Sequence, residues 1–381
     1  MKKQTTLYAK IIDFKKRYFP GRIVPQKIAS RIDIFFNRLH NYLITQKNKK
    51  KSKKDTTEIK KQNITIIETE PLIQGGKNQN EHSLNHLIKN DFNFQTRESN
   101  EKIALVAIAK NEGPYLMEWI AYHLMLGVDH IYIYDDGSTD NSQEAYETMY
   151  KTGKLTVLQA LKTGQTSYKQ TDCWELWRQQ YGQLYDFVLP WDVDEFLALK
   201  AGMNLKQFLA LIPHDVGEIR FNWKIFGSSG QLFADWSKFV IERFTKHSAA
   251  NREHARITKT IIRLSAMTPG HVITHHVTGI KPEFKVVGGD LKTEVERSET
   301  KISPVIWNGF AVCHHYNIKS AEEFILIKKT RGYWPDCGRT ITDEYFSPND
   351  LNEIEDRSMI RHAEPLRKYI EEIKSIVWPR M

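Results

Sequence analysis

The sequence predicts an α/β fold in which a mixed sheet is flanked by helices, and three observations support this prediction. The continuous apolar run 103–109 is typical of a strand that is covered on both faces. Strand-like and helix-like segments then alternate along the chain. Polar clusters follow three of the predicted strands. Ligands of open α/β sheets bind at the carboxyl ends of strands, so we expect the functional site at this edge.

The alternating patterns define the elements of one folded domain. Strands are predicted at 103–109, 130–134, 155–158 and 186–191, and helices at 113–126, 142–150 and 171–185. We assign residues 101–346 to this domain. Residues 347–381 are predicted to form a C-terminal helical segment, which either packs on the domain or binds a partner.

The N-terminal part has a different composition. Residues 1–62 hold 18 Lys and Arg against 4 Asp and Glu, whereas the remainder holds 37 against 42, so the net charge of +9 belongs to this part. Apolar residues at helical spacing within 1–46 predict a basic amphipathic helical extension. This extension either lies on an anionic membrane or packs on the folded domain as a helical hairpin. Residues 47–100 are predicted to be a flexible linker.

Cysteine usage and hydropathy indicate the compartment. Cys173, Cys313 and Cys337 are far apart and lack C-x-x-C spacing, which argues against a disulfide framework or a structural zinc site. No segment reaches the roughly 18 to 20 apolar residues of a membrane-spanning helix. We therefore expect a cytoplasmic location. If the N-terminal extension lies on a membrane, the expected contact is peripheral and at the inner face of the cell membrane. No nucleic-acid motif accompanies the Lys-rich tail, so nucleic acid is not an expected partner.

The strongest local signal is Asp192-Val-Asp194-Glu195, which directly follows a predicted buried strand. Mg²⁺ and Mn²⁺ prefer carboxylate oxygens and complete their coordination shell with water and substrate phosphates. A metal held there would stabilise the charge on a departing nucleoside diphosphate. An isolated D-x-D pair is more often a solvated turn or a helix cap. The preceding strand and the two other polar strand ends favour a metal site.

The two other polar strand ends are 110–112 and 135–140. The second one, Asp-Asp-Gly-Ser-Thr-Asp, consists of common turn residues, and Asp140 is a suitable N-cap for the next predicted helix. A purely structural role is therefore the alternative for this turn.

Several motifs in order resemble a known family. The stretch 107–119, with His123 and the segments 127–131 and 134–141, resembles the start of bacterial family 2 like glycosyltransferases, which are related to the family 92 type. The segment 191–196 agrees with this resemblance. So do His315-Tyr-Asn-Ile-Lys-Ser320 and the later Glu323, Phe324, Arg331 and Gly332.

The resemblance implies a GT-A (Rossmann-like) fold that uses a nucleoside diphosphate sugar, with a UDP-sugar as the expected donor. It implies that the first two strand ends hold the base and ribose and that Asp192 faces the ribose or the metal. Asp194 would be the main ligand of Mn²⁺ or Mg²⁺, with Glu195 as support and His315 completing the metal shell. The implied donor-binding residues are Lys110, Asn111, Glu112, Asp135, Asp136, Asp192, Lys319 and Arg331.

Two of these donor-binding residues are cationic, and further residues are expected at the acceptor. Lys319 and Arg331 could neutralise diphosphate oxygens, although a solvated helix face is the alternative. An aromatic strand followed by a small-residue loop suits a sugar acceptor, and the expected acceptor residues are Trp223, Phe226, Gly227, Ser228 and Ser229. The family commonly has His where this chain has Gln231. For the general base, Asp235 is the first candidate, before Glu242 and Asp290.

The expected function is therefore inverting, metal-dependent sugar transfer to a glycan or lipid-linked acceptor, in the synthesis of a cell-envelope polysaccharide or lipopolysaccharide. One alternative is a nucleotidyltransferase or phosphohydrolase, which also uses paired carboxylates with a metal. Another is a catalytically idle GT-A domain that binds glycans or acts as a scaffold. The absence of G-x-x-x-x-G-K-[ST] and G-x-G-x-x-G motifs argues against a nucleoside triphosphatase or a dinucleotide enzyme.

Overall fold

The computed structural model describes residues 98–161, 169–268, 275, 279–297, 301–307, 309–331 and 341–377. The predicted N-terminal helices (1–46) lie outside these residues, as do nearly all of the predicted linker (47–100) and Cys337. Among the described residues, no helix is both long enough and apolar enough to cross a membrane.

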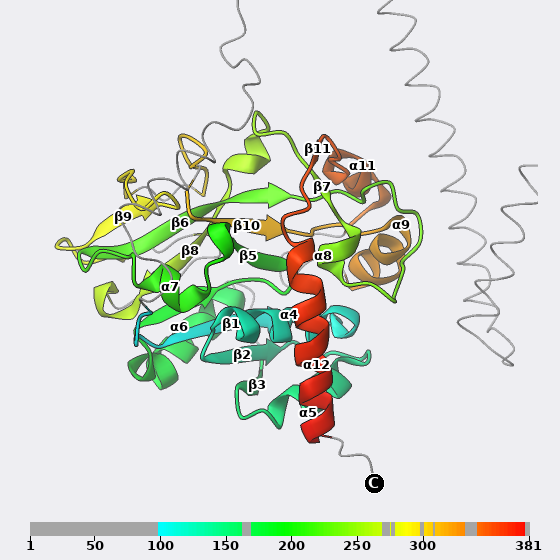
Figure 1. The fold of residues 1–381 in the computed structure, drawn as a ribbon, viewed down its shortest axis with the longest axis horizontal. Helices are drawn as coiled ribbons and strands as arrows, with labels where there is room; N and C mark the ends of the chain where they lie inside the picture. Colours follow the sequence, from blue (N-terminus) through cyan, green and yellow to red (C-terminus); the bar gives the residue numbers. More distant parts are fainter. Residues whose placement is uncertain are drawn as a thin grey trace, which may run out of the picture. The chain divides into compact units, whose positions relative to one another are not determined.

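The main sheet has a parallel half and a mixed half (Figure 1). The parallel half has the order β3-β2-β1-β4 and consists of β1 (Ile103–Ala109), β2 (His130–Asp135), β3 (Leu155–Gln159) and β4 (Phe187–Pro190). Next to β4, β8 (Thr258–Arg263) runs antiparallel to both β4 and β6 (Val216–Ile225). The predicted mixed α/β sheet is therefore confirmed.

The long strand β6 joins the rest of the sheet. Its first half pairs in parallel with β9 (Lys285–Gly288), and its second half pairs in parallel with β10 (Ala311–His315). Strand β5 (Glu195–Leu199) lies antiparallel to β10 at the edge. A separate two-stranded sheet pairs β7 (Lys246–His247) with β11 (Ile354–Glu355).

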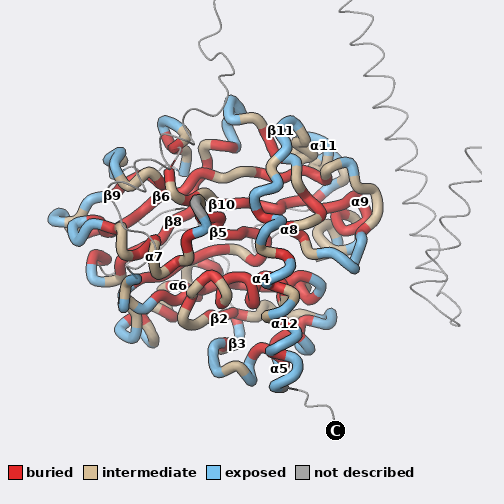
Figure 2. Tube along the Cα trace, viewed as in Figure 1, coloured by how far each residue is buried: buried red, intermediate tan, exposed pale blue. Residues whose placement is uncertain are grey.

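The position of β1 inside the domain explains why its sequence is continuously apolar. Ile103, Leu105 and Ala107 belong to one buried cluster, and the intervening residues of β1 belong to another. Helices α4 (Gly113–Leu126), α5 (Ser142–Tyr150) and α12 (Ala363–Val377) contribute to the first cluster. Helix α6 (Lys169–Tyr181) contributes to the second. Both faces of the strand are thus covered, and the buried residues run through the centre of the domain (Figure 2).

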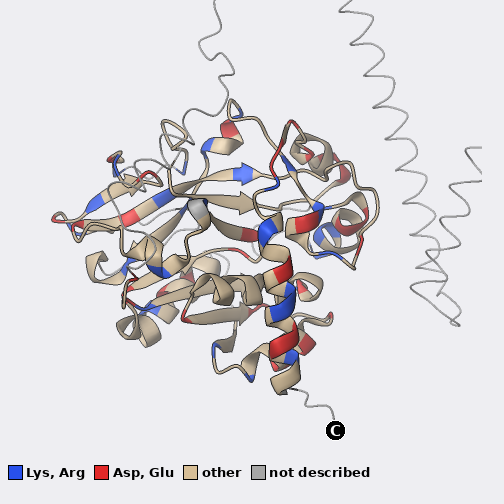
Figure 3. Ribbon diagram, viewed as in Figure 1, with Lys and Arg blue, Asp and Glu red and all other residues tan. Residues whose placement is uncertain are grey.

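The C-terminal helix packs on the same core as the rest of the domain. Leu366, Ile370 and Ile373 of α12 are buried in the cluster that contains α4. The other side of α12 carries charges of both signs (Figure 3). Of the two alternatives for the C-terminal segment, the structure therefore shows packing on the domain, through α12.

Apart from 3₁₀ turns, the remaining helices in the described part of the chain are short. They are α7 (Leu205–Leu209), α8 (Val240–Arg243), α9 (Ala321–Glu323), a π-helical turn (Phe324–Lys328), α10 (Lys329–Arg331) and α11 (Phe346–Asn349). The predicted helix at 171–185 is shorter than expected, because α6 ends at Tyr181 and a 3₁₀ turn follows at Gly182–Leu184.

Candidate active site

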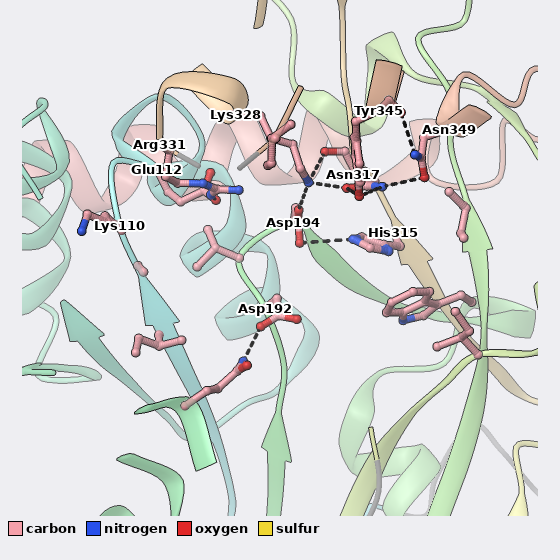
Figure 4. A pocket seen from close by; sticks show the side chains of 18 of the residues that line it. Lys110, Glu112, Asp192, Asp194, His315, Asn317, Lys328, Arg331, Tyr345 and Asn349 are labelled. Carbon is pink, nitrogen blue, oxygen red and sulfur yellow. Dashed lines mark hydrogen bonds and ion pairs between the residues drawn. The ribbon is translucent and has the colours of Figure 1, made fainter. Parts of the chain in front are cut away.

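A pocket of about 490 Å³ lies at the carboxyl ends of β1 and β4 and extends to the ends of β6 and β10 (Figure 4). We call it the strand-end pocket. Its charged and polar lining residues are Lys110, Glu112, Asp136, Gln170, Asp192, Asp194, His254, Lys301, His315, Asn317, Lys328, Arg331, Tyr345 and Asn349. Trp223, Ile225 and Ile257 are among its apolar residues. The mixture of carboxylates and cations suits a ligand that has both hydroxyl and phosphate groups.

Asp192 is fixed by two neighbours. Its Oδ1 accepts a hydrogen bond from Gln170 Nε2 at 2.6 Å, and its Oδ2 lies 2.7 Å from Lys259 Nζ. Burial by itself lowers the pKa of Lys259, but the carboxylates of Asp192 and Glu195 outweigh burial and raise this pKa above its ordinary value. Lys259 therefore remains charged and holds the loop that carries Asp192.

Glu195 lies beneath the pocket. Its side chain is fully buried, its Oε2 lies 2.9 Å from Lys259 Nζ, and the same oxygen accepts a hydrogen bond from the backbone N–H of Asp192 at 3.0 Å. Burial raises the pKa of Glu195 to about 8, although Lys259 opposes this shift. Glu195 thus acts on the site by holding Asp192.

Asp194 points into the pocket between a histidine and a lysine (Figure 4). Its Oδ1 lies 3.5 Å from His315 Nε2, and its Oδ2 lies 3.4 Å from Lys328 Nζ. Burial by itself raises the pKa of Asp194, but Lys328 and His315 outweigh burial and hold this pKa well below its ordinary value. Asp194 is therefore ionised at neutral pH.

His315, at the end of β10, is suited to bind a metal together with Asp194. Burial lowers the pKa of His315, although Asp194 opposes this shift, so the imidazole is neutral at neutral pH. A neutral imidazole nitrogen and a carboxylate oxygen are donors that Mn²⁺ accepts. Among the described residues, no group of three or more His, Cys, Asp or Glu side chains gathers as a metal site. The two side chains fit a cation whose other ligands come from water and phosphate oxygens.

Lys328 and Arg331 reach the pocket from one helical segment. A π-helical turn covers Phe324–Lys328 and continues into α10, so that Phe324 stays buried while Lys328 and Arg331 line the pocket. Such π turns are frequent at functional sites. Lys328 Nζ donates to the backbone oxygen of Asn317 at 2.6 Å, and Arg331 forms an ion pair with Glu112. Burial lowers the pKa of Arg331 only to about 10, so it remains charged.

The loop after β2 is built against the start of α4. Asn111 has a positive φ of 51°, and its Oδ1 accepts a hydrogen bond from the backbone N–H of Thr139 at 2.7 Å. Asp135 accepts hydrogen bonds from Ser138 N at 2.8 Å and from Tyr146 Oη at 3.0 Å. These two side chains therefore hold the loop.

Comparison with known proteins identifies the family. The family model of glycosyltransferase family 92 matches residues 108–303, which is slightly more than half of the chain. The chain belongs to glycosyltransferase family 92. This match includes the ends of β1, β2 and β4, but it stops before His315, Lys328 and Arg331.

Curated plant proteins are similar to this family 92 chain over part of their length. A family 92 protein of Oryza sativa subsp. japonica is 27% identical over 200 residues, which cover 51% of this chain and 32% of the relative. One from Ricinus communis is 24% identical over 200 residues (51% and 34%), and one from Arabidopsis thaliana is 30% identical over 172 residues (42% and 28%). The chain thus matches about a third of the length of these relatives.

Solved structures show a more distant likeness. Glucosyl-3-phosphoglycerate synthase from Mycobacterium tuberculosis, in complex with Mn²⁺, UDP and phosphoglyceric acid, has a TM-score of 0.29 and 15% identity, covering 53% of this chain and 72% of that chain. The catalytic domain of Drosophila β1,4-galactosyltransferase 7 in complex with xylobiose has a TM-score of 0.24 and 11% identity, covering 57% and 93%. These low scores assign no ligand to this family 92 chain.

The pocket brings together most of the predicted donor and metal residues. The predicted residues that line it are Lys110, Glu112, Asp136, Asp192, Asp194, Trp223, His315 and Arg331. Lys319 does not line it: its Nζ lies 4.2 Å from the centre of the Tyr115 ring and donates to the backbone oxygen of Tyr316 at 3.2 Å. Asn111, Asp135 and Glu195 also lie outside the lining and support it from behind, as described above.

The predicted acceptor loop lies away from the pocket, apart from Trp223. Phe226 packs on His314, and a Cβ at Gly227 would meet the backbone of Leu351. The backbone N–H groups of Ser228 and Ser229 donate to the side chains of Asp350 and Asn352 at 2.7 Å each. The segment after α11 therefore covers this loop, which the local composition does not reveal.

The expected general bases are also elsewhere. Asp235 is exposed and accepts a hydrogen bond from Ser237 Oγ at 2.6 Å. Glu242 pairs with Arg367, and Asp290 accepts a hydrogen bond from Thr293 Oγ1. None of the three lines the strand-end pocket.

Sequence reasoning missed several lining residues that come from distant segments, namely Gln170, His254, Lys301, Asn317, Lys328, Tyr345 and Asn349. Asn317 lies inside the quoted motif 315–320, so its proximity to His315 was a usable signal. Lys328 lies three residues before Arg331, a spacing that places both on one side of a helix. The other residues carry no local signal.

Proposed function

We propose that this chain transfers a sugar from a nucleoside diphosphate sugar, with UDP-sugar as the preferred donor, to a glycan or lipid-linked acceptor. The observation that carries the proposal is the convergence of Asp192, Asp194, His315, Lys328 and Arg331 on one pocket at the carboxyl ends of the strands. Membership in glycosyltransferase family 92 supports the same reaction class.

The residues of the pocket suit different parts of such a donor. Lys110 and Asp136, whose charged groups lie 3.4 Å apart, offer a donor and an acceptor to the nucleoside. Arg331 and Lys328 offer charged N–H groups to the diphosphate. Trp223 offers an aromatic surface to a sugar, and its ring lies 4.3 Å from that of His315.

Asp194 and His315 would hold a divalent cation, Mn²⁺ or Mg²⁺, with Asp192 beside them. When bound, such a cation stabilises negative charge on the leaving diphosphate. The protein contributes by fixing Asp192 through Gln170 and Lys259 and by keeping Asp194 ionised. This preorganisation lowers the reorganisation needed when charge develops on the leaving group.

The finer parts of the proposal concern stereochemistry and location. We propose inversion at the anomeric carbon, with a base on the acceptor side of the pocket other than Asp235. ¹H NMR of the first product formed would distinguish the two anomers.

We further propose that residues 1–46 contact the inner face of the cell membrane and that the acceptor is a cell-envelope polysaccharide or lipopolysaccharide. Equal sedimentation of the full chain and a variant lacking residues 1–60 with anionic vesicles would contradict the membrane contact.

The first test is hydrolysis of UDP-, GDP-, CMP- and dTDP-sugars with and without Mn²⁺. We expect metal-dependent release of one nucleotide, reduced about 100-fold or more in Asp194→Asn, because this substitution removes the central carboxylate charge. Asp235→Asn is the matched control, because Asp235 is exposed and outside the pocket. Binding of UDP without turnover of any donor, even with glycan acceptors present, would favour the idle-domain alternative.

A further inference from the structure

A second cavity, of about 450 Å³, lies next to the strand-end pocket. An antiparallel bridge between Ile257 and Ile302 forms the boundary. Ile257 lines the strand-end pocket, whereas its neighbours Arg256 and Thr258 line the second cavity. The two cavities therefore share a wall, and they have different lining residues.

The second cavity lies on a polar face of the sheet, from which Arg220 and Thr258 line it. Glu218, Arg220 and Asn222 alternate along β6, and the register places Thr260 beside Arg220 and Thr258 beside Asn222 on β8. All five are at most 3% exposed. Burying so many polar groups is costly unless each one finds a partner.

The roof of the cavity is the segment 302–307, which Asn222 holds down. Asn222 Nδ2 donates to Ser303 Oγ at 2.7 Å, and Asn222 Oδ1 accepts a hydrogen bond from the backbone N–H of Trp307 at 2.9 Å. The Trp307 ring lies over Gly288, where a Cβ would come within 2.4 Å of the ring. Gly288 is the register partner of Arg220, so the indole lies over the strand next to Arg220.

Three N–H donor groups in or behind the wall of this cavity have no acceptor among the described residues. Arg220 pairs with Glu218 at 3.2 Å through one terminal nitrogen, but its Nε atom, buried behind the cavity surface, has no hydrogen-bond partner in the part of the chain that the structure describes. The buried Nε1 atom of Trp307 also finds no partner within the described ranges. Arg256 makes no ion pair or side-chain hydrogen bond with any residue that the structure describes.

The charges and shape of the cavity define the ligand that fits it. Among the described residues, two arginines and one acid, Glu296, line the cavity, and Glu218 pairs with Arg220 behind the lining. Arginine binds carboxylates and phosphates through paired N–H groups. The volume lies within the range of about 300 to 1,000 Å³ that is common for small-molecule sites. The indole of Trp307, with Ile302 and Pro304, offers apolar surface to a sugar ring.

We propose that the second cavity binds an anionic saccharide. Arg256 and Arg220 hold its carboxylate or phosphate group, and Trp307 contacts its ring. This part of the molecule then recognises an acidic residue of the acceptor glycan, a role that rests on the proposed function.

The test is NMR titration of the full chain, observing the indole N–H signal that disappears in Trp307→Phe. The probes are glucuronate, glucose 6-phosphate, inorganic phosphate and neutral glucose. We expect glucuronate or glucose 6-phosphate to shift the Trp307 signal and glucose to leave it unmoved. Whichever of the two acids binds more tightly identifies the acidic group.

Variants assign the binding to this cavity. Arg256→Gln should weaken binding about tenfold or more, since it removes a charged partner of the acid. Arg252→Gln is the matched control, because Arg252 is half-exposed, pairs with Glu353 and lies outside both cavities. Arg256→Lys, which keeps the charge, should retain part of the binding. Comparison of thermal unfolding midpoints shows whether each variant is folded.

Three outcomes would overturn the proposal: no shift with any anion, an equal shift with glucose, or undiminished binding in Arg256→Gln. If inorganic phosphate bound as tightly as glucose 6-phosphate, the sugar ring would contribute nothing to binding, and a saccharide would be refuted as the ligand. Binding is also measured in Asp194→Asn, where we expect it to persist. Saccharide binding in a wild-type chain that hydrolyses no donor would therefore reject the proposed function and leave the cavity assignment in place.

Discussion

The ammonium group of Lys328 lies 3.4 Å from Oδ2 of Asp194, the carboxylate at the centre of the strand-end pocket. Lys328 comes from the π-helical turn before α10, whereas Asp194 follows β4, so the two meet only through the tertiary fold. Lys328 thus contacts the same carboxylate that we propose as a ligand of the metal ion. Its ammonium group supplies positive charge for a diphosphate before any metal binds.

Substitution of Lys328 by Met should separate turnover from metal binding. Turnover of the donor should fall roughly tenfold to hundredfold, as expected for the loss of a charge-assisted hydrogen bond. Mn²⁺ should bind more tightly, because the ammonium group no longer competes for Asp194. Initial rates and Mn²⁺ titration followed by EPR measure the two effects.

Lys329→Met is the control for this prediction, since Lys329 is the next residue and pairs with Asp343 at 2.6 Å, outside the pocket. Equal losses in the two variants would show that the effect is not specific to the pocket.

Substitution of Lys259 by Met should destabilise the fold. Lys259 balances the carboxylates of Asp192 and Glu195, and removing one partner of a buried ion pair costs about 3 to 5 kcal/mol. Urea unfolding measures the change. Part of the loss should be recovered in Lys259→Met/Asp192→Asn, where the carboxylate left without its partner is removed. Lys285→Met, at a half-exposed ion pair with Asp215, should change the stability by less than about 1 kcal/mol.

Substitution of Gly113 by Ala should disturb the first turn of α4. A Cβ at this position would lie 2.3 Å from Asn141 Oδ1 and 2.7 Å from the backbone nitrogen of Ser142. The loop or the helix must shift, and such overpacking costs about 1 to 3 kcal/mol. Because Glu112 precedes this turn, binding of UDP measured by calorimetry should also weaken. Gly182→Ala, whose Cβ would make ordinary contacts from 3.4 Å, should change UDP binding little.

Stability should depend on pH through Glu118. This residue is buried on α4 and accepts hydrogen bonds from the backbone N–H groups of Val240 at 2.7 Å and Ile241 at 3.1 Å. Burial raises the pKa of Glu118 to about 7, although both hydrogen bonds oppose this shift. The folded chain therefore keeps a proton that the unfolded chain loses from about pH 4.3 upward. The free energy of unfolding should decrease as the pH rises from 4.3 to 7.

The measurement compares wild type with Glu118→Gln by urea unfolding between pH 4.5 and 8. The free energy of unfolding of wild type relative to the variant should fall by up to about 3 kcal/mol over this range, because one pKa unit corresponds to about 1.4 kcal/mol. Glu144→Gln, on the exposed side of α5, provides the control. A constant difference between wild type and Glu118→Gln would contradict the assignment.

The sequence alone was sufficient to predict the parallel half of the sheet and the position of the acidic residues at the strand ends. Strand β1 has both faces buried, so its apolar run carries the signal by itself, and the predicted strands and helices up to Tyr150 match the structure closely. Asp192 and Asp194 follow a buried strand directly, and chain connectivity alone brings them to the sheet edge. The resemblance of the motifs to a family was likewise contained in the sequence, and the family match bears it out.

Only the tertiary structure decided which residues share the pocket and which lie behind it. Lys328, Asn317 and Tyr345 are brought to Asp194 by packing of segments more than 100 residues away in the sequence. The loop 227–229 looked like an acceptor site because small residues suit a ligand, but they suit close backbone packing equally well. The segment 350–352 occupies that place. The local sequence determines which kinds of group a residue can contact. The long-range packing of the chain determines which of these groups actually lies next to it.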